Sequence, residues 1–273
     1  MIKERHILWE ENENTYKNGR YQIQYVDSFI HEDEEYRPGI YIIPGGGYTH
    51  VSPREADNVA ERFYEMGYQA FVLMYTVDEF SRVPLKLQPL RDASRGLRLI
   101  RSKADEFKIF KNKVAVCGFS AGGHLAAALC LHHGDIEDDK YGDFSNRPDA
   151  AILCYPVISA GNHAHRGSFD TLLGDMATMD EIKYMSLEKQ VTADMVPSFI
   201  WTTAGDESVP IENSMLFAMA LREKKVPYAL HIFSEGRHGR NLGYATDTEP
   251  AINEIMVWPE LADRFVSRYM LQS

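Results

Sequence analysis

Residues 113–127, KVAVCGFSAGGHLAA, join a short apolar run to a helix-forming run through the pattern Gly-x-Ser-x-Gly. The run before the serine has the composition of a buried strand, whereas the alanines and leucines after it favour a helix. A serine on such a sharp turn needs glycine two residues to either side, because bulk there would collide with the neighbouring strand and helix. The motif therefore predicts a strand–turn–helix unit that projects the Ser120 hydroxyl above a sheet, near the positive end of the helix.

Similar apolar runs recur along the chain, with helical patterns between them. The runs are apolar throughout, as expected for strands covered on both faces, at residues 39–43, 69–76, 113–117, 149–155, 198–204 and 227–233. Helices are expected at residues 53–66, 90–107, 121–132, 211–224 and 250–270. This alternation, with connections long enough for helices, predicts an α/β fold with a mostly parallel, doubly wound sheet.

The first expected helix has both start and stop signals. Ser52 and Glu55 have capping-box spacing, Pro53 suits the first helical position, and Gly67 suits the end. The spacing therefore predicts that Glu55 caps this helix.

Two segments depart from the alternation. The opening stretch, including residues 21–30, is expected to supply an antiparallel edge of the sheet, and residues 158–196 form a long insertion without a clear period. An insertion of this length between two strands is typical of a lid or partial cap. Because no repeat, low-complexity tract or linker divides the chain, residues 1–273 are expected to form one domain with a small lid insertion.

An acid and a histidine follow two later apolar runs, where a nucleophilic serine would need them. Asp206 comes directly after SFIWTTA, and His238 comes shortly after ALHIF. The order Ser, acid, His is that of the strand–turn–helix hydrolases, in which the acid orients the histidine and the histidine activates the serine. Glu207 is a rival for the acid, but Asp206 lies nearer the strand end. Other histidines lie in strand, helix or insertion patterns that fit the role less well, at His124, His132, His133, His163, His165 and His231.

Three consecutive glycines follow the run GIYII, in Pro44-Gly45-Gly46-Gly47-Tyr48. Glycines let backbone N–H groups approach a substrate oxygen without a side chain in the way, and this is where hydrolases of this kind place oxyanion donors. The amides of Gly46, Gly47 and Ala121 are the candidates. A phosphate-binding loop is the weaker interpretation, because no Gly-Lys-Ser/Thr follows.

Composition limits the other functional classes. The net charge of −11 argues against nonspecific binding to nucleic acid or anionic lipid, and no apolar run is long enough to cross a bilayer. The three cysteines fit buried, reduced thiols, and the amino terminus lacks the apolar core of a signal peptide, so a cytoplasmic location is expected. The pair His163 and His165 has no third ligand at a recognised spacing, so neither a metal nor a cofactor is expected. Tyr48 and Trp201 are left open between the pocket and the core.

Several of these pieces resemble one known group. PGGGYTHVSPREADNVAERFYEMGYQAFVLMY, VAVCGFSAGGHLAA, Tyr155-Pro156, GSFDTLLGD, AGDESVP and His238-Gly239 occur in this order over most of residues 40–240. They resemble the α/β-hydrolase esterase/lipase superfamily, in the hormone-sensitive-lipase-related branch with acetylxylan-esterase-like and BD-FAE-type sugar esterases. The lipase-type branch usually has histidine before its three glycines, so Pro44 favours the sugar-esterase-like branch.

The resemblance implies a serine esterase that needs no cofactor. It implies Ser120 as nucleophile, Asp206 as acid and His238 as base, with Gly46, Gly47 and Ala121 as oxyanion donors. The expected partner is a small-molecule ester such as an acetylated sugar, whereas the oligomeric state is left open, a homodimer included. A peptidase or arylformamidase could use the same triad, and a binding protein on an inactive hydrolase scaffold is the alternative from another class.

Overall fold

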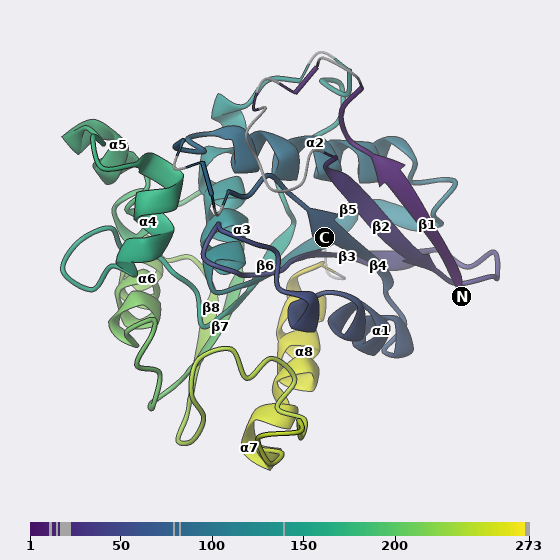
Figure 1. The fold of residues 1–273 in the computed structure, drawn as a ribbon. Coiled ribbons are helices and arrows are strands. Elements are labelled where there is room, and N and C mark those ends of the chain that lie inside the picture. The colour runs from purple at the N-terminus through teal and green to yellow at the C-terminus, as the bar shows by residue number, and fades with distance from the viewer. Residues whose placement is uncertain are drawn as a thin grey trace.

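One mixed sheet organises the molecule. The computed structural model describes residues 1–10, 13–14, 16, 23–78, 80–81, 83–138 and 140–270. Within these residues, eight strands form a single sheet in the order β1-β2-β4-β3-β5-β6-β7-β8 (Figure 1). The strands are β1 (Ile2–Ile7), β2 (Tyr25–Ile30), β3 (Arg37–Ile43), β4 (Gln69–Met74), β5 (Ile109–Phe119), β6 (Ala150–Cys154), β7 (Ser198–Thr203) and β8 (Tyr228–Phe233).

The pairing of the strands confirms the expected fold class. From β4 and β3 through to β8, every neighbouring pair is parallel, whereas β2 pairs antiparallel with both β1 and β4. The antiparallel edge was expected from residues 21–30, of which 21 and 22 lie outside the described residues. β6 and β7 are buried throughout, and β3 and β5 are buried over their carboxyl-terminal parts, residues 39–43 and 114–119, where the uniformly apolar runs were found.

Helices cover both faces of the sheet. One core cluster joins the sheet to α2, α3 and α6, and the other joins it to α1 and α8, so the sheet lies between two helical layers (Figure 1). The α-helices are α1 (Asp57–Glu65), α2 (Gln88–Ser102), α3 (Ala121–His132), α4 (Arg166–Leu173), α5 (Met179–Tyr184), α6 (Glu212–Glu223), α7 (Asn253–Met256) and α8 (Trp258–Met270). No helix among the described residues has both the length and the apolar character needed to span a bilayer.

Three predicted helices have different bounds from those expected. The helix expected over 53–66 begins as a short 3-10 turn, Pro53–Glu55, and becomes α1 only after Ala56. The helix expected over 90–107 ends at Ser102, and the chain then turns back toward β5 through Lys108, whose φ is +51°. The helix expected over 250–270 is divided into α7 and α8, because Pro259 has no backbone N–H and fits only the first turn of a new helix.

The insertion at 158–196 contains α4 and α5 and is attached to a distant loop. The amides of Leu85 and Lys86 donate to the carbonyls of Thr171 and Leu172 at 3.2 and 2.7 Å. The Lys86 ammonium lies 2.6 Å from the carboxylate of Glu181 in α5. The 83–87 loop and the two insertion helices therefore form one connected wall beside the sheet.

A buried tryptophan joins α8 to the strand ends. Trp258 has no exposed surface, and its ring stacks on Trp201 of β7 with centroids 5.6 Å apart. Its indole N–H donates to the carbonyl of Asn241 at 2.9 Å, in the loop after β8. Trp258 therefore supports both the sheet face and a loop at the carboxyl edge of the sheet.

Replacement of Trp258 should lower the stability of the fold, and more so when the new side chain is smaller. We expect Trp258→Ala to lower the free energy of unfolding by about 3–5 kcal/mol, because it leaves a cavity between α8 and the sheet. Trp258→Phe keeps an aromatic ring and should cost less. The measurement is the urea midpoint of each variant, with Val257→Ala, an exposed neighbour, as the control. Equal midpoints for Trp258→Ala and Val257→Ala would contradict this account.

Candidate active site

Ser120 occupies the turn between β5 and α3 in the conformation that the motif predicts. Its φ is 52° and its ψ is −119°, a backbone region that side-chain-bearing residues rarely adopt and that is associated with functional sites. A Cβ atom placed on Gly118 would lie 2.3 Å from the carbonyl oxygen of Gly122, and one on Gly122 would lie 2.2 Å from that of Ile43. Both glycines are therefore required by close backbone contact.

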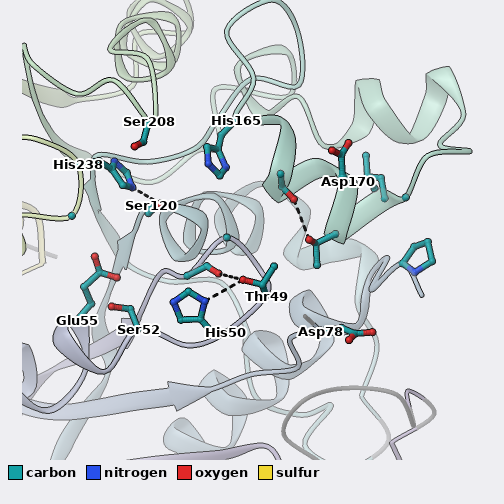
Figure 2. Close-up of a pocket in the computed structure, with 18 of the residues that line it drawn as sticks. Thr49, His50, Ser52, Glu55, Asp78, Ser120, His165, Asp170, Ser208 and His238 are labelled. Carbon is teal, nitrogen blue, oxygen red and sulfur yellow. Dashed lines mark hydrogen bonds between the residues drawn. The ribbon is translucent and has the colours of Figure 1, made fainter. Parts of the chain in front are cut away.

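The structure brings the three predicted catalytic side chains together. His238 Nε2 lies 2.8 Å from Ser120 Oγ, and His238 Nδ1 lies 2.6 Å from Asp206 Oδ2 (Figure 2 shows the serine and the histidine). The three residues follow β5, β7 and β8, whose carboxyl ends meet at one edge of the parallel sheet. Glu207, the rival acid, is exposed.

Asp206 is held in place by its own backbone partners. Its Oδ1 atom accepts hydrogen bonds from the amides of Ser208 and Val209 at 3.0 and 2.9 Å, and its side chain has no exposed surface. With Oδ2 accepting from His238 Nδ1–H, Nε2 of the imidazole is left as the acceptor for the Ser120 hydroxyl. The arrangement can therefore take a proton from Ser120 and hold the resulting imidazolium beside a carboxylate.

The glycine loop after β3 borders the same space. Gly46 and Gly47 line the pocket with φ values of 123° and 65°, and Ala121 is the first residue of α3. Among the described residues, neither the Gly46 nor the Gly47 amide donates a hydrogen bond, whereas the Gly45 amide donates to Glu55 at 2.8 Å. The oxyanion role of Gly46, Gly47 and Ala121 stays a prediction that this geometry supports.

Glu55 does not cap a helix, so the predicted capping box is wrong. Its carboxylate turns inward and is 4% exposed, with Oε2 accepting from the Gly45 amide and Oε1 accepting from the Tyr155 hydroxyl at 2.7 Å. The Ser52 side chain makes no capping hydrogen bond. Burial raises the pKa of Glu55, although the bonds from Tyr155 and Gly45 act in the opposite direction. The two buried donors compete for this carboxylate more effectively than an exposed helix end does.

Through Tyr155, Glu55 is connected to the histidine loop. The Tyr155 ring meets the His238 ring edge-on, with centroids 4.9 Å apart, and its hydroxyl accepts from the Asn241 amide at 3.2 Å. One buried carboxylate thus joins the loops that follow β3, β6 and β8. Sequence reasoning missed this residue, since Ser-x-x-Glu at a helix start is also the signature of a capping box.

The pocket above Ser120 is large, and many charged and hydroxyl-bearing residues line it alongside apolar ones. It has a volume of about 1320 Å³ and receives charged or hydroxyl side chains from the glycine loop, the 77–87 loop and α4 (Figure 2). Its charged and hydroxyl-bearing walls include Thr49, Asp78, Lys86, Asp170, Thr171, Asp175, Ser208 and Arg237.

Apart from His165, which lines the pocket, the remaining sequence candidates lie outside the reacting centre. Tyr48 and Trp201 are buried in the core, where the Tyr48 hydroxyl contacts His124 Nδ1 at 2.8 Å. Burial lowers the pKa of His124 to about 4. His163 lies 3.9 Å from Glu212, and within the described ranges no three His, Cys, Asp or Glu side chains are grouped as a metal site. Three buried cysteines are free thiols: Cys117, Cys130 and Cys154.

Comparison with known proteins finds similarity to a family model, to esterases and to a xylanase. Residues 27–221 match the BD-FAE family model. Endo-1,4-beta-xylanase B of Butyrivibrio fibrisolvens is 45% identical over 86% of this chain, and the acetylxylan esterase of Xylanibacter ruminicola is 29% identical over 74%. These matches span only 37% and 40% of the two relatives' own lengths.

A solved structure matches the chain over nearly its full length. The acetyl ester-xyloside bifunctional hydrolase of Caldicellulosiruptor lactoaceticus superposes with a TM-score of 0.84 and 36% identity, covering 97% of this chain and 96% of its own. The fold is therefore that of the α/β-hydrolases.

Loss of the Glu55 carboxylate should disturb the site while leaving the triad residues intact. Glu55→Ala leaves two buried donors unpaired, at about 1–3 kcal/mol each, and releases the glycine loop. We expect the rate at which a fluorophosphonate labels Ser120 to fall at least tenfold in Glu55→Ala. The rate should fall less in Glu55→Gln, because glutamine keeps one acceptor oxygen.

The rate is followed by intact-protein mass spectrometry. Glu61→Gln, on the exposed face of α1, serves as the matched control and should label like the wild type. Labelling of Glu55→Ala at the wild-type rate would show that this carboxylate does not position the site.

Proposed function

The chain belongs to the BD-FAE family, and from this premise we propose that it is a serine carboxylic-ester hydrolase. The observation that carries the proposal is the continuous hydrogen-bonded series from Asp206 through His238 to Ser120, at 2.6 and 2.8 Å. The esterase names of the relatives point the same way. The proposed catalytic residues are Ser120, Asp206 and His238, with Gly46, Gly47 and Ala121 as oxyanion donors.

The proposed reaction proceeds through an acyl-enzyme. Ser120 Oγ attacks the acyl carbonyl carbon while its proton passes to His238 Nε2, and Asp206 keeps the imidazole in the required tautomer. The backbone amides stabilise the tetrahedral oxyanion. His238 then protonates the departing alcohol, and a water molecule, activated by the same histidine, releases the carboxylic acid. The original serine proton thus leaves with the alcohol, and a proton from the water molecule restores the Ser120 hydroxyl through His238, so no cofactor is required.

The preferred substrate is a short-acyl ester of a sugar or similar alcohol. The pocket lining includes Asp78, Asp170 and Thr171, whose oxygens can form hydrogen bonds with a hydroxyl-rich alcohol and gain nothing from a long aliphatic chain. The names of two matched proteins, an acetylxylan esterase and an acetyl ester-xyloside hydrolase, support this choice. Neutral esters also suit a chain with a net charge of −11.

The domain organisation proposed here is a single hydrolase domain over residues 1–273. In it, residues 158–196 act as a partial cap, since α4 contributes side chains to the pocket wall. Free thiols at Cys117, Cys130 and Cys154 fit a reducing compartment such as the cytoplasm.

Removal of the serine hydroxyl is the direct test of the mechanism. Ser120→Ala should lower kcat for 4-nitrophenyl acetate by about 10³-fold or more, and a fluorophosphonate should no longer label the protein. Asp206→Asn should also lower kcat strongly, because it no longer fixes the histidine tautomer. Equal rates for wild type and Ser120→Ala would refute the proposal. Ser145→Ala, a serine outside the pocket, is the control.

Acyl length should separate a short-acyl esterase from a lipase. We expect kcat/KM to be highest for acetyl or propionyl esters and to fall about tenfold or more by octanoyl, since a long chain would displace water from charged lining residues such as Asp78 and Asp170 without replacing its hydrogen bonds. The measurement is a series of 4-nitrophenyl esters of increasing chain length. A maximum at octanoyl or beyond would contradict the short-acyl assignment.

A further inference from the structure

His165 lies in the pocket but takes no part in the proposed triad. It ends the loop that leads from β6 into α4, and it lines the pocket together with Ser120 and His238. Figure 2 shows its imidazole pointing into the pocket beside Ser120, across from the loop residues Thr49 and His50. The side chain is partly exposed, so a ligand in the pocket can reach it.

The cap of α4 fixes the tautomer of this histidine. His165 Nδ1 accepts a hydrogen bond from the backbone amide of Ser168 at 3.3 Å, as the N-cap of α4, and the Ser168 hydroxyl lies 2.8 Å from the same atom. The same amide also donates to the His165 carbonyl at 3.1 Å. With Nδ1 accepting from the amide and able to accept from the Ser168 hydroxyl, the arrangement favours the neutral tautomer that carries its proton on Nε2.

The Nε2–H group is left without a partner. In the described part of the chain, the hydrogen bonds of the His165 ring involve Nδ1 alone. Burial, together with the neighbouring His238, lowers the pKa of His165, which favours the neutral ring. The pocket thus contains a fixed, uncharged N–H donor close to the reacting centre.

The geometry points to a binding role for His165 that goes beyond the triad: we propose that its Nε2–H donates a hydrogen bond to an oxygen of the alcohol part of the ester. This inference rests on the proposed function. The acyl oxygen is taken by the amides of Gly46, Gly47 and Ala121, whereas the departing alcohol must lie beside His238. His165 and His238 both line the pocket around Ser120 (Figure 2), so an oxygen next to the scissile ester is within reach of either imidazole.

This role favours one class of alcohol. A neutral N–H donor matches a hydroxyl or ring-ether oxygen adjacent to the ester, as on a pyranose, and has no match in an alcohol without a second oxygen there. A pocket donor discriminates against substrates that exclude water from it and offer it no acceptor. His165 is therefore a specificity-determining residue for oxygen-rich alcohols.

A structural role in capping α4 is the competing explanation, and one substitution separates the two. His165→Asn keeps an acceptor for the Ser168 amide, and asparagine is among the best N-cap residues, but its side chain ends before the position of Nε2. His165→Gln restores an N–H near that position while capping less well. His163→Asn, two residues earlier and outside the pocket, is the matched control.

The experiment compares two acetyl esters with these variants and the wild type. The first is an acetylated methyl xylopyranoside, whose alcohol has oxygens next to the ester, and the second is 4-nitrophenyl acetate, whose alcohol has none there. For His165→Asn we expect kcat/KM to fall roughly tenfold on the sugar ester, mainly through KM, and to stay near wild type on the nitrophenyl ester. His165→Gln should recover part of the loss, and His163→Asn should behave as wild type on both.

Other outcomes would overturn the inference in distinguishable ways. Wild-type rates for His165→Asn on both esters would mean that His165 is only a helix cap. An equal decrease of kcat/KM on both esters would mean that His165 does not act by binding the alcohol part of the substrate. If the wild type hydrolyses neither ester, the proposed function fails, and the inference fails with it.

Discussion

The site depends on one backbone contact between two neighbouring strand ends. The turn after β5 and the glycine loop after β3 approach so closely that a Cβ atom on Gly122 would lie 2.2 and 2.3 Å from the carbonyl oxygens of Ile43 and Pro44. A Cβ atom on Gly45 would lie 2.9 Å from the Cβ atom of Ser120. Since β3 and β5 are paired in the sheet, this contact fixes the distance between the serine and the glycine amides through the backbone. Such a site needs little reorganisation when charge develops on a substrate oxygen.

The buried carboxylate of Glu55 extends this constraint to the histidine. A desolvated carboxylate is costly unless donors surround it, and here the donors are the Gly45 amide and the Tyr155 hydroxyl. Tyr155 in turn packs edge-on against His238. The buried Glu55 carboxylate keeps its hydrogen bonds only while the loops after β3, β6 and β8 hold their relative positions. The same positions bring Ser120 and His238 together, so one arrangement of the loops satisfies both.

The sheet and the triad were predictable because their signals are local. Each of Ser120, Asp206 and His238 follows an apolar run, and parallel strands bring their carboxyl ends to one edge. Glu55 was not predictable in the same way. Its sequence neighbours predict that Glu55 caps a helix. Its partner Tyr155 lies 100 residues away, and no periodic pattern in the sequence links the two. Whether Glu55 caps the helix or binds Gly45 and Tyr155 depends on burial, and burial is defined only in the folded chain.

The insertion shows why the substrate is harder to predict than the chemistry. Its two helices are short, and α4 is capped by a histidine, which is not among the preferred capping residues. The wall that they form also depends on distant pairing, because Pro84 packs where a side chain on Gly174 would be, 2.4 Å from the position of its Cβ. Apolar strand runs and glycine turns are local signals, so they predict where Ser120, Asp206 and His238 lie. Under the proposed function, the residues that contact the alcohol belong to this wall, and they meet only through long-range contacts that leave no local signal in the sequence.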